Sequence, residues 1–122
     1  TELSHQILGG SDFILMPSRY EPCGLTQLYA FAYGTIPIVR QVGGLSDTVI
    51  NTTPNNIRKN RATGITFRPL TPKSIVRSIT NAMEIYKNKE ILSQIQINVM
   101  KQDFSWEKQA KLYLQLYDTL FQ

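Results

Sequence analysis

A turn between an apolar run and a predicted helix carries the residues with the clearest chemical potential in this sequence. Residues 13–16 are all apolar, two prolines in the following turn exclude a regular helix, and apolar residues recur at helical spacing from Leu25. The first N–H groups of such a helix have no partner within it and carry the positive end of its dipole. Because Gly24 allows close backbone approach and Glu21 lies beside it, this turn suits a phosphate-bearing ligand.

The carboxylate of Glu21 has two interpretations. On a tight turn beside a helix N-terminus it can accept hydrogen bonds from sugar hydroxyls and stabilise positive charge that develops during a reaction. It can equally cap the helix, which is a common structural role for an acidic residue at this position. Spacing alone favours the cap.

A strand–helix–strand unit must position this turn. Residues 12–16 predict a strand covered on both faces, and residues 36–39 predict a second buried strand, although Pro37 cannot donate a ladder hydrogen bond. Between them, residues 25–33 predict a helix that ends at Gly34. The predicted apolar face of this helix comprises Leu25, Leu28, Tyr29 and Ala32.

The remaining elements predict a parallel α/β sheet with right-handed crossovers. They are the end of a helix at 2–9, a helical turn near 45–50, a polar loop at 51–63 and a strand at 64–67. A helix capped by Thr71 and Pro72 follows, and its apolar stripe comprises Ile75, Val76, Ile79, Ala82, Met83 and Tyr86. The last two elements are a helix at 89–101 and a helix capped by Ser105 with a wide apolar face at 106–121. About three strands are visible, which is half of a doubly wound, Rossmann-like sheet. The open edge of such a half sheet invites pairing with another chain.

Composition limits the class of protein. A chain of 122 residues with 42% hydrophobic and 18% charged residues is long enough and apolar enough for one globular domain. No apolar run is long enough to span a bilayer, so we expect no membrane partner. The net charge of +4 is scattered, and the group Arg58, Lys59 and Arg61 lacks aromatic platforms, so we expect a solvated loop and no nucleic-acid partner.

Other chemistries find little support in the sequence. Cys23 is the single cysteine, which excludes an internal disulfide and fits a reducing compartment. Because no base is evident near it in the sequence, Cys23 is not expected to act as a nucleophile. His5 is the only histidine and is expected at the surface, and no residues have the spacing of metal ligands. Asp47 can polarise a hydroxyl or cap a turn. We therefore predict neither a metal nor a cofactor.

Three ordered segments carry a resemblance to a known family. They are Pro17-Ser18-Arg19-Tyr20-Glu21-Pro22-Cys23-Gly24-Leu25-Thr26-Gln27-Leu28-Tyr29, then Tyr33-Gly34-Thr35-Ile36-Pro37-Ile38-Val39-Arg40, then Gly43-Gly44-Leu45-Ser46-Asp47-Thr48-Val49, and the similarity continues to Phe104-Ser105-Trp106. Together they resemble the bacterial glycogen synthases and plant starch synthases. A run of this length is far more specific than a lone glycine motif.

This resemblance implies a retaining glucosyltransferase with two Rossmann-like domains facing across a cleft. It would transfer glucose from ADP-glucose, or another nucleotide-glucose, to the non-reducing end of an α-1,4-glucan without a metal. Residues 1–122 would be the C-terminal part of the nucleotide-sugar-binding domain, with the N-terminal catalytic partner domain absent and the fragment alone inactive. The resemblance also implies a cytoplasmic location, or the plastid stroma in a plant or alga.

The resemblance assigns roles to the turn and the first helical residues. Glu21 would be the catalytic residue beside the donor glucose. The substrate-binding set would be Pro22, Cys23, Gly24, Leu25, Thr26, Gln27 and Tyr29. Within it, Cys23 and Gly24 would line the sugar pocket by their backbone, and Leu25 and Thr26 would bind the distal phosphate.

Tyr29 marks a difference from many related transferases, which have a second glutamate eight positions after the first. Gln27 and Tyr29 can line the nucleotide side, although core packing is the simpler interpretation of Tyr29. Two other classes of function remain open. One is a nucleotide- or glucan-binding module without chemistry, and the other is a docking domain that uses the aromatic face of the last helix.

Overall fold

Three short parallel strands form the centre of the protein in a computed structural model that describes residues 2–20, 25–102 and 104–121. Strand β2 (Ile36–Arg40) lies between β1 (Phe13–Met16) and β3 (Ile65–Phe67). Ile36 pairs with Phe13 of β1, and Ile38 pairs with Ile65 of β3. The parallel α/β arrangement predicted from the sequence is confirmed.

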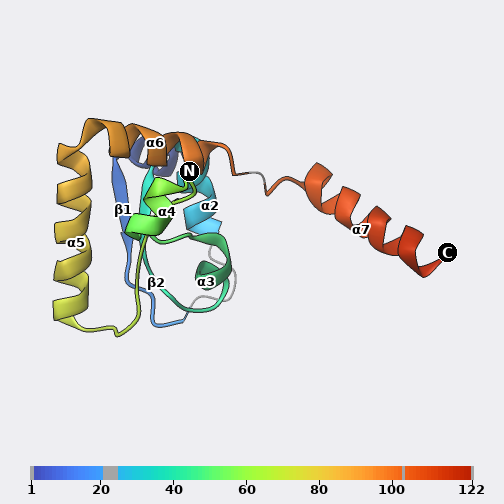
Figure 1. The fold of residues 1–122 in the computed structure, drawn as a ribbon, viewed down its shortest axis with the longest axis horizontal. Helices are drawn as coiled ribbons and strands as arrows, with labels where there is room; N and C mark the ends of the chain where they lie inside the picture. Colours follow the sequence, from blue (N-terminus) through green and yellow to red (C-terminus); the bar gives the residue numbers. More distant parts are fainter. Residues whose placement is uncertain (1, 21–24, 103, 122) are drawn as a thin grey trace.

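Seven helices accompany the sheet in the described residues. They are α1 (Glu2–Gly9), α2 (Leu25–Tyr33), α3 (Gly44–Thr48), α4 (Pro54–Arg58), α5 (Pro72–Lys87), α6 (Lys89–Met100) and α7 (Trp106–Leu120). Helix α5 packs on β3 and β2, while α2 and α6 pack on β2 and on each other. In Figure 1, α5 runs along one side of the sheet, α6 crosses its upper end, and α7 stands apart.

Pro37 occupies the central strand without losing a ladder bond. The Ile36 N–H donates to the Asp12 carbonyl on the β1 side, 2.9 Å away, so the backbone N of the next residue points toward the β3 side. Pairing with β3 starts only at Ile38. The missing N–H of Pro37 therefore lies before the start of β3, where no ladder partner is required.

Gly64 lets the chain pass close to β2 just before β3 begins. A Cβ at this position would lie 2.7 Å from the Pro37 carbonyl oxygen and 2.6 Å from Cγ1 of Val49. Neither neighbour is the free end of a flexible side chain, so the close approach requires glycine. Gly64 therefore determines how closely the segment between α4 and β3 can approach β2.

Two predictions about burial, for β1 and for α2, were wrong. Leu15 of β1 is 40% exposed, because β1 is an edge strand that pairs only with β2 among the described strands. The buried face of α2 comprises Gln27, Ala30 and Phe31, so Leu25, Tyr29 and Ala32 face outward. The helix turns this face inward because it packs against both β2 and α6.

The stripe of α5 is also only half covered. Ala82 is buried, whereas Ile79, Met83 and Tyr86 are exposed and line an apolar hollow of about 290 Å³ together with Phe13 and Ile38. This hollow lies beside β1, whose outer edge has no partner strand in the described chain. An element that continued the sheet beside β1 would cover both the hollow and the outer edge of this strand.

The polar loop predicted at 51–63 contains a helix that the sequence analysis missed. Thr53 caps α4 by accepting a hydrogen bond from the Asn56 N–H, 3.2 Å away, and Pro54 is its first residue. This combination of a threonine cap and an N-terminal proline was the available signal. It was obscured by the surrounding asparagines, which favour turns.

Helix α7 buries none of its residues in the described structure, although its predicted cap at Ser105 is confirmed. Trp106 is 85% exposed, and Tyr113 and Tyr117 are more than half exposed. The ring of Phe104 stacks on Phe31 of α2, with centroids 6.1 Å apart, where the chain leaves the body of the fold. The wide apolar face of α7 is thus without cover from residues 2–20 and 25–102.

We predict that Gly64→Ala lowers the free energy of unfolding of the full chain by about 1–3 kcal/mol, because the new methyl group overlaps the Pro37 carbonyl. Gly9→Ala is the matched control, since its Cβ would meet only the ring of Tyr33, at 3.3 Å, on the surface. Urea unfolding followed by circular dichroism measures both. Equal midpoints for the two variants would contradict the proposed constraint.

Candidate functional site

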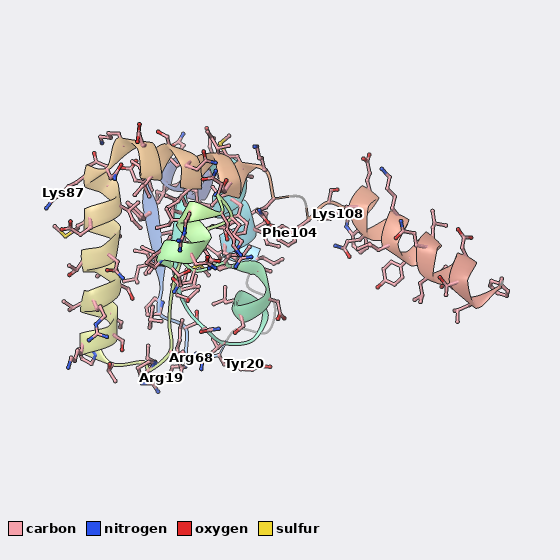
Figure 2. The ribbon with its side chains drawn as sticks, in the orientation of Figure 1. Arg19, Tyr20, Arg68, Lys87, Phe104 and Lys108 are labelled. Carbon is pink, nitrogen blue, oxygen red and sulfur yellow. The ribbon has the colours of Figure 1, made fainter. Side chains whose placement is uncertain are left out.

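The three strands end at one edge of the sheet, and the turns that follow them lie together there. Arg40, the last residue of β2, connects these turns through its guanidinium group. Its Nη1 donates to the Arg19 carbonyl at 2.7 Å and to the Ser18 carbonyl at 3.4 Å, and its Nε donates to the Arg68 carbonyl at 3.1 Å. Figure 2 shows Arg19, Tyr20 and Arg68 at the same end of the molecule.

The first turn of α2 lies open to solvent next to this edge. Leu25 is 55% exposed and Thr26 is also exposed. Helix α2 has no acidic side chain in its first turn, so the N–H groups there face no competing carboxylate within the helix. The geometry is suitable for a phosphate at the backbone of Leu25 and Thr26, and that assignment stays a prediction.

Four predicted site residues, Glu21, Pro22, Cys23 and Gly24, lie outside the described residues. The structure does place the chain on either side of them. Tyr20 is 77% exposed beside Arg19, whose carbonyl accepts from Arg40, and Leu25 starts α2. The roles predicted for these four residues stay predictions.

Thr26 and Tyr29 share a cavity of about 530 Å³ with residues of α1 and β1. Its walls include His5 and Leu8 of α1 and Ile14 of β1. Tyr29 is 53% exposed, so the interpretation of this residue as core was wrong, because its side of α2 faces away from the sheet. The structure thus brings together two of the predicted binding residues on an accessible surface.

Gln27 lies on the opposite side of α2, with no exposed surface. Its Nε2 donates to Oγ1 of Thr48 at 3.2 Å, and the Thr48 hydroxyl in turn donates to the Gly44 carbonyl at 3.0 Å. In this structure the Gln27 side chain therefore has no surface to offer a ligand. It instead connects α2 to α3 and to the turn that carries Gly43, whose φ of 50° favours glycine.

Two residues that sequence reasoning did not single out, Arg40 and Thr48, organise this edge. A charged residue at the end of a buried strand was a usable signal for Arg40, since strand ends of parallel sheets face ligands. Thr48 gave no comparable signal, because its partner lies 21 positions away on another helix.

The remaining candidates are on the surface. Asp47 is exposed on α3, and His5 is exposed with its Nδ1 2.8 Å from the Tyr33 hydroxyl, as predicted for a surface residue. Within residues 2–20, 25–102 and 104–121, no three His, Cys, Asp or Glu side chains are grouped to hold a metal ion. In the same residues, no helix combines the length and apolarity needed to cross a membrane.

A parallel sheet with an open helix N-terminus at its carboxyl edge is the arrangement of a nucleotide-binding α/β domain. The chain belongs to the family described as glycosyl transferases group 1, which matches residues 2–99. The resemblance found in the sequence is thereby confirmed at the level of the family.

Particular relatives narrow this assignment. The chain is 46% identical over 118 residues to glycogen synthase 2 of Nitrosococcus oceani and 47% identical over 118 residues to a glycogen synthase of Rhizobium etli, in each case over 97% of this chain. The catalytic domain of starch synthase IV from Arabidopsis thaliana, solved with ADP and acarbose, superposes with a TM-score of 0.83 and 36% identity over 98% of this chain. The chain spans about a quarter of these proteins, namely 24%, 25% and 24% of their lengths.

We predict that Thr48→Val lowers the free energy of unfolding by about 1–3 kcal/mol, because it removes the acceptor used by the buried Gln27 amide. Thr80→Val on α5 is the control, since the exposed Thr80 hydroxyl bonds only the Val76 carbonyl of its own helix, 2.9 Å away. Thermal unfolding of the full chain compares the two. An equal effect of both substitutions would refute a special role for the connection between α2 and α3.

Proposed function

We propose that this chain is part of a glycogen or starch synthase that transfers glucose from ADP-glucose to the non-reducing end of an α-1,4-glucan with retention of configuration. The observation that carries this proposal is the close structural likeness, over nearly the whole chain, to a starch synthase domain holding ADP and acarbose. The glycogen synthases among its relatives support the same reaction. Their names do not specify the nucleotide, so ADP-glucose is the part of the proposal that most needs a test.

In this proposal the predicted site residues other than Gln27 keep their roles. Glu21 stabilises the donor glucose as positive charge develops on it, Cys23 and Gly24 line the sugar pocket by their backbone, and Pro22 belongs to the same substrate-binding set. The backbone N–H groups of Leu25 and Thr26 hold the distal phosphate. The exposure of Thr26 and Tyr29 around one cavity supports a ligand on this side of α2, whereas Gln27 contributes by packing.

The proposal also requires protein outside residues 1–122. The chain covers about a quarter of its relatives, so we propose that a separate N-terminal domain supplies the acceptor site and the remaining catalytic groups. The edge of β1 that pairs with no other described strand and the apolar hollow under α5 are the surfaces where the sheet continues, or where copies associate if they stay uncovered. We propose a cytoplasmic location because a single cysteine, which cannot form an internal disulfide, fits a reducing compartment.

The central test is glucosyl transfer from ADP-glucose to glycogen by the full-length protein. We expect Glu21→Ala and Glu21→Gln each to lower kcat by about 100-fold or more, because the charge that supports the donor glucose is lost. Glu84→Gln is the matched control, since Glu84 lies exposed on α5, 3.6 Å from Lys87. UDP-glucose is assayed in parallel to identify the nucleotide.

Two outcomes would contradict parts of this proposal. Full activity in both Glu21 variants, with circular dichroism unchanged, would remove the role of Glu21 and leave the reaction standing. Binding of ADP without transfer from any nucleotide-glucose would favour a binding module without chemistry.

We further propose that α7 packs against another part of the full-length protein. Its apolar side chains recur at the spacing of one helical face, and they are Trp106, Ala110, Tyr113, Leu114, Tyr117 and Leu120. Exposed apolar faces of this size on a folded protein are usually interfaces. The resemblance to the synthases implies a contact across domains.

For this helix we predict that Leu114→Asp lowers the thermal midpoint of the full-length protein by several degrees, equivalent to about 2–3 kcal/mol for a buried leucine. Gln115→Asp, one position further along α7, places the same charge outside the apolar face. Differential scanning calorimetry measures both variants. If Leu114→Asp behaves like Gln115→Asp, the face is exposed in the full protein as well.

A further inference from the structure

Arg40 connects all three turns at the carboxyl edge of the sheet, and no motif or comparison assigns it a role. Its Nη1 donates to the carbonyls of Ser18 and Arg19 after β1, and its Nε donates to the carbonyl of Arg68 after β3. The Arg40 backbone itself belongs to β2. One side chain thus joins segments that lie about 20 to 30 residues apart in the chain, as the separations of 21, 22 and 28 positions show.

The backbone around Arg40 makes this anchor rigid. Arg40 pairs with Phe67 at the end of the β2–β3 ladder, and the Gln41 N–H donates to the Phe67 carbonyl at 2.7 Å. The Arg68 Nε donates to Oε1 of Gln41 at 3.0 Å, so the turn after β3 is held from both sides. The guanidinium group therefore projects from a fixed point toward the turn after β1.

A guanidinium group is suited to this task in a way that an ammonium group is not. Its donors lie in one plane at fixed angles, so the carbonyls that accept from them are fixed relative to one another. A lysine at this position would keep the charge but would present one nitrogen at the end of a flexible stem. The three acceptors are backbone oxygens, so the contact fixes the path of the chain whatever side chains the turn carries.

We infer that Arg40 is a positioning residue that holds the backbone at Ser18 and Arg19, after β1, in place against the turn after β3. This inference rests on the proposed glucosyl transfer and deepens it. Arg40 acts there through the backbone at Ser18 and Arg19, which precede α2 in the chain, and not by contact with the reacting atoms. Loss of the guanidinium fork should therefore lower turnover more than it weakens substrate binding.

The experiment compares Arg40→Lys and Arg40→Met with the unsubstituted full-length protein in the ADP-glucose transfer assay. We expect both variants to lower kcat by about 10- to 100-fold, with a smaller change in the KM for ADP-glucose, because small misplacements in a site are costly. Arg77→Lys is the control, since Arg77 is exposed on α5. Recovery of full activity in Arg40→Lys would overturn the inference in favour of a role for charge alone.

Hydrogen exchange read by mass spectrometry tests the same connection without relying on activity. In both Arg40 variants the amides of residues 18–20 and of the turn after β3 should exchange faster, while those of β1 and β2 stay protected. Unchanged exchange in these turns would overturn the inference, as would global unfolding of Arg40→Lys, which would make Arg40 a residue needed for folding. Absence of transfer in the unsubstituted protein would instead refute the proposed function, and the exchange comparison would then decide the role of Arg40 by itself.

Discussion

The structure depends on the position of β2 between two parallel partners. Ladders on both sides fix the register of the sheet, so that all three strands end at the same edge. This arrangement is possible because Pro37 lies where β3 has not yet begun, and because Gly64 allows the chain to approach Pro37 closely. Residues 36–39 of β2 are all buried, on both faces of the sheet.

Side-chain hydrogen bonds across the carboxyl edge of the sheet hold the segments of the candidate site together. Arg40 joins the turns after β1 and β3, and the Gln27–Thr48 contact joins α2 to α3. Both contacts start from buried or half-buried positions and end on groups near the surface. The exposed first turn of α2 is thus joined to α3 through Gln27, and the chain before it is held by Arg40, as a site that orients a substrate requires.

The uncovered surfaces are consistent with a chain that spans about a quarter of the length of its relatives. The outer edge of β1 adjoins the apolar hollow beside α5, and the exposed apolar face of α7 is a second uncovered region in the described residues. Under the proposed function, these regions are where the remainder of the full-length protein would pack.

Local signals in the sequence determined the elements and their order. The apolar runs gave the strands, Gly34 with its φ of 74° ended α2, and threonine or serine caps began α5 and α7, because these signals act over a few neighbouring residues. The ordered segments around Glu21 also sufficed to indicate the family. Only the tertiary structure decided which face of α2 is buried, that β1 lies at an edge, and that Arg40 and Thr48 bridge distant turns. Those features depend on contacts between residues 20 or more positions apart, which no local pattern records.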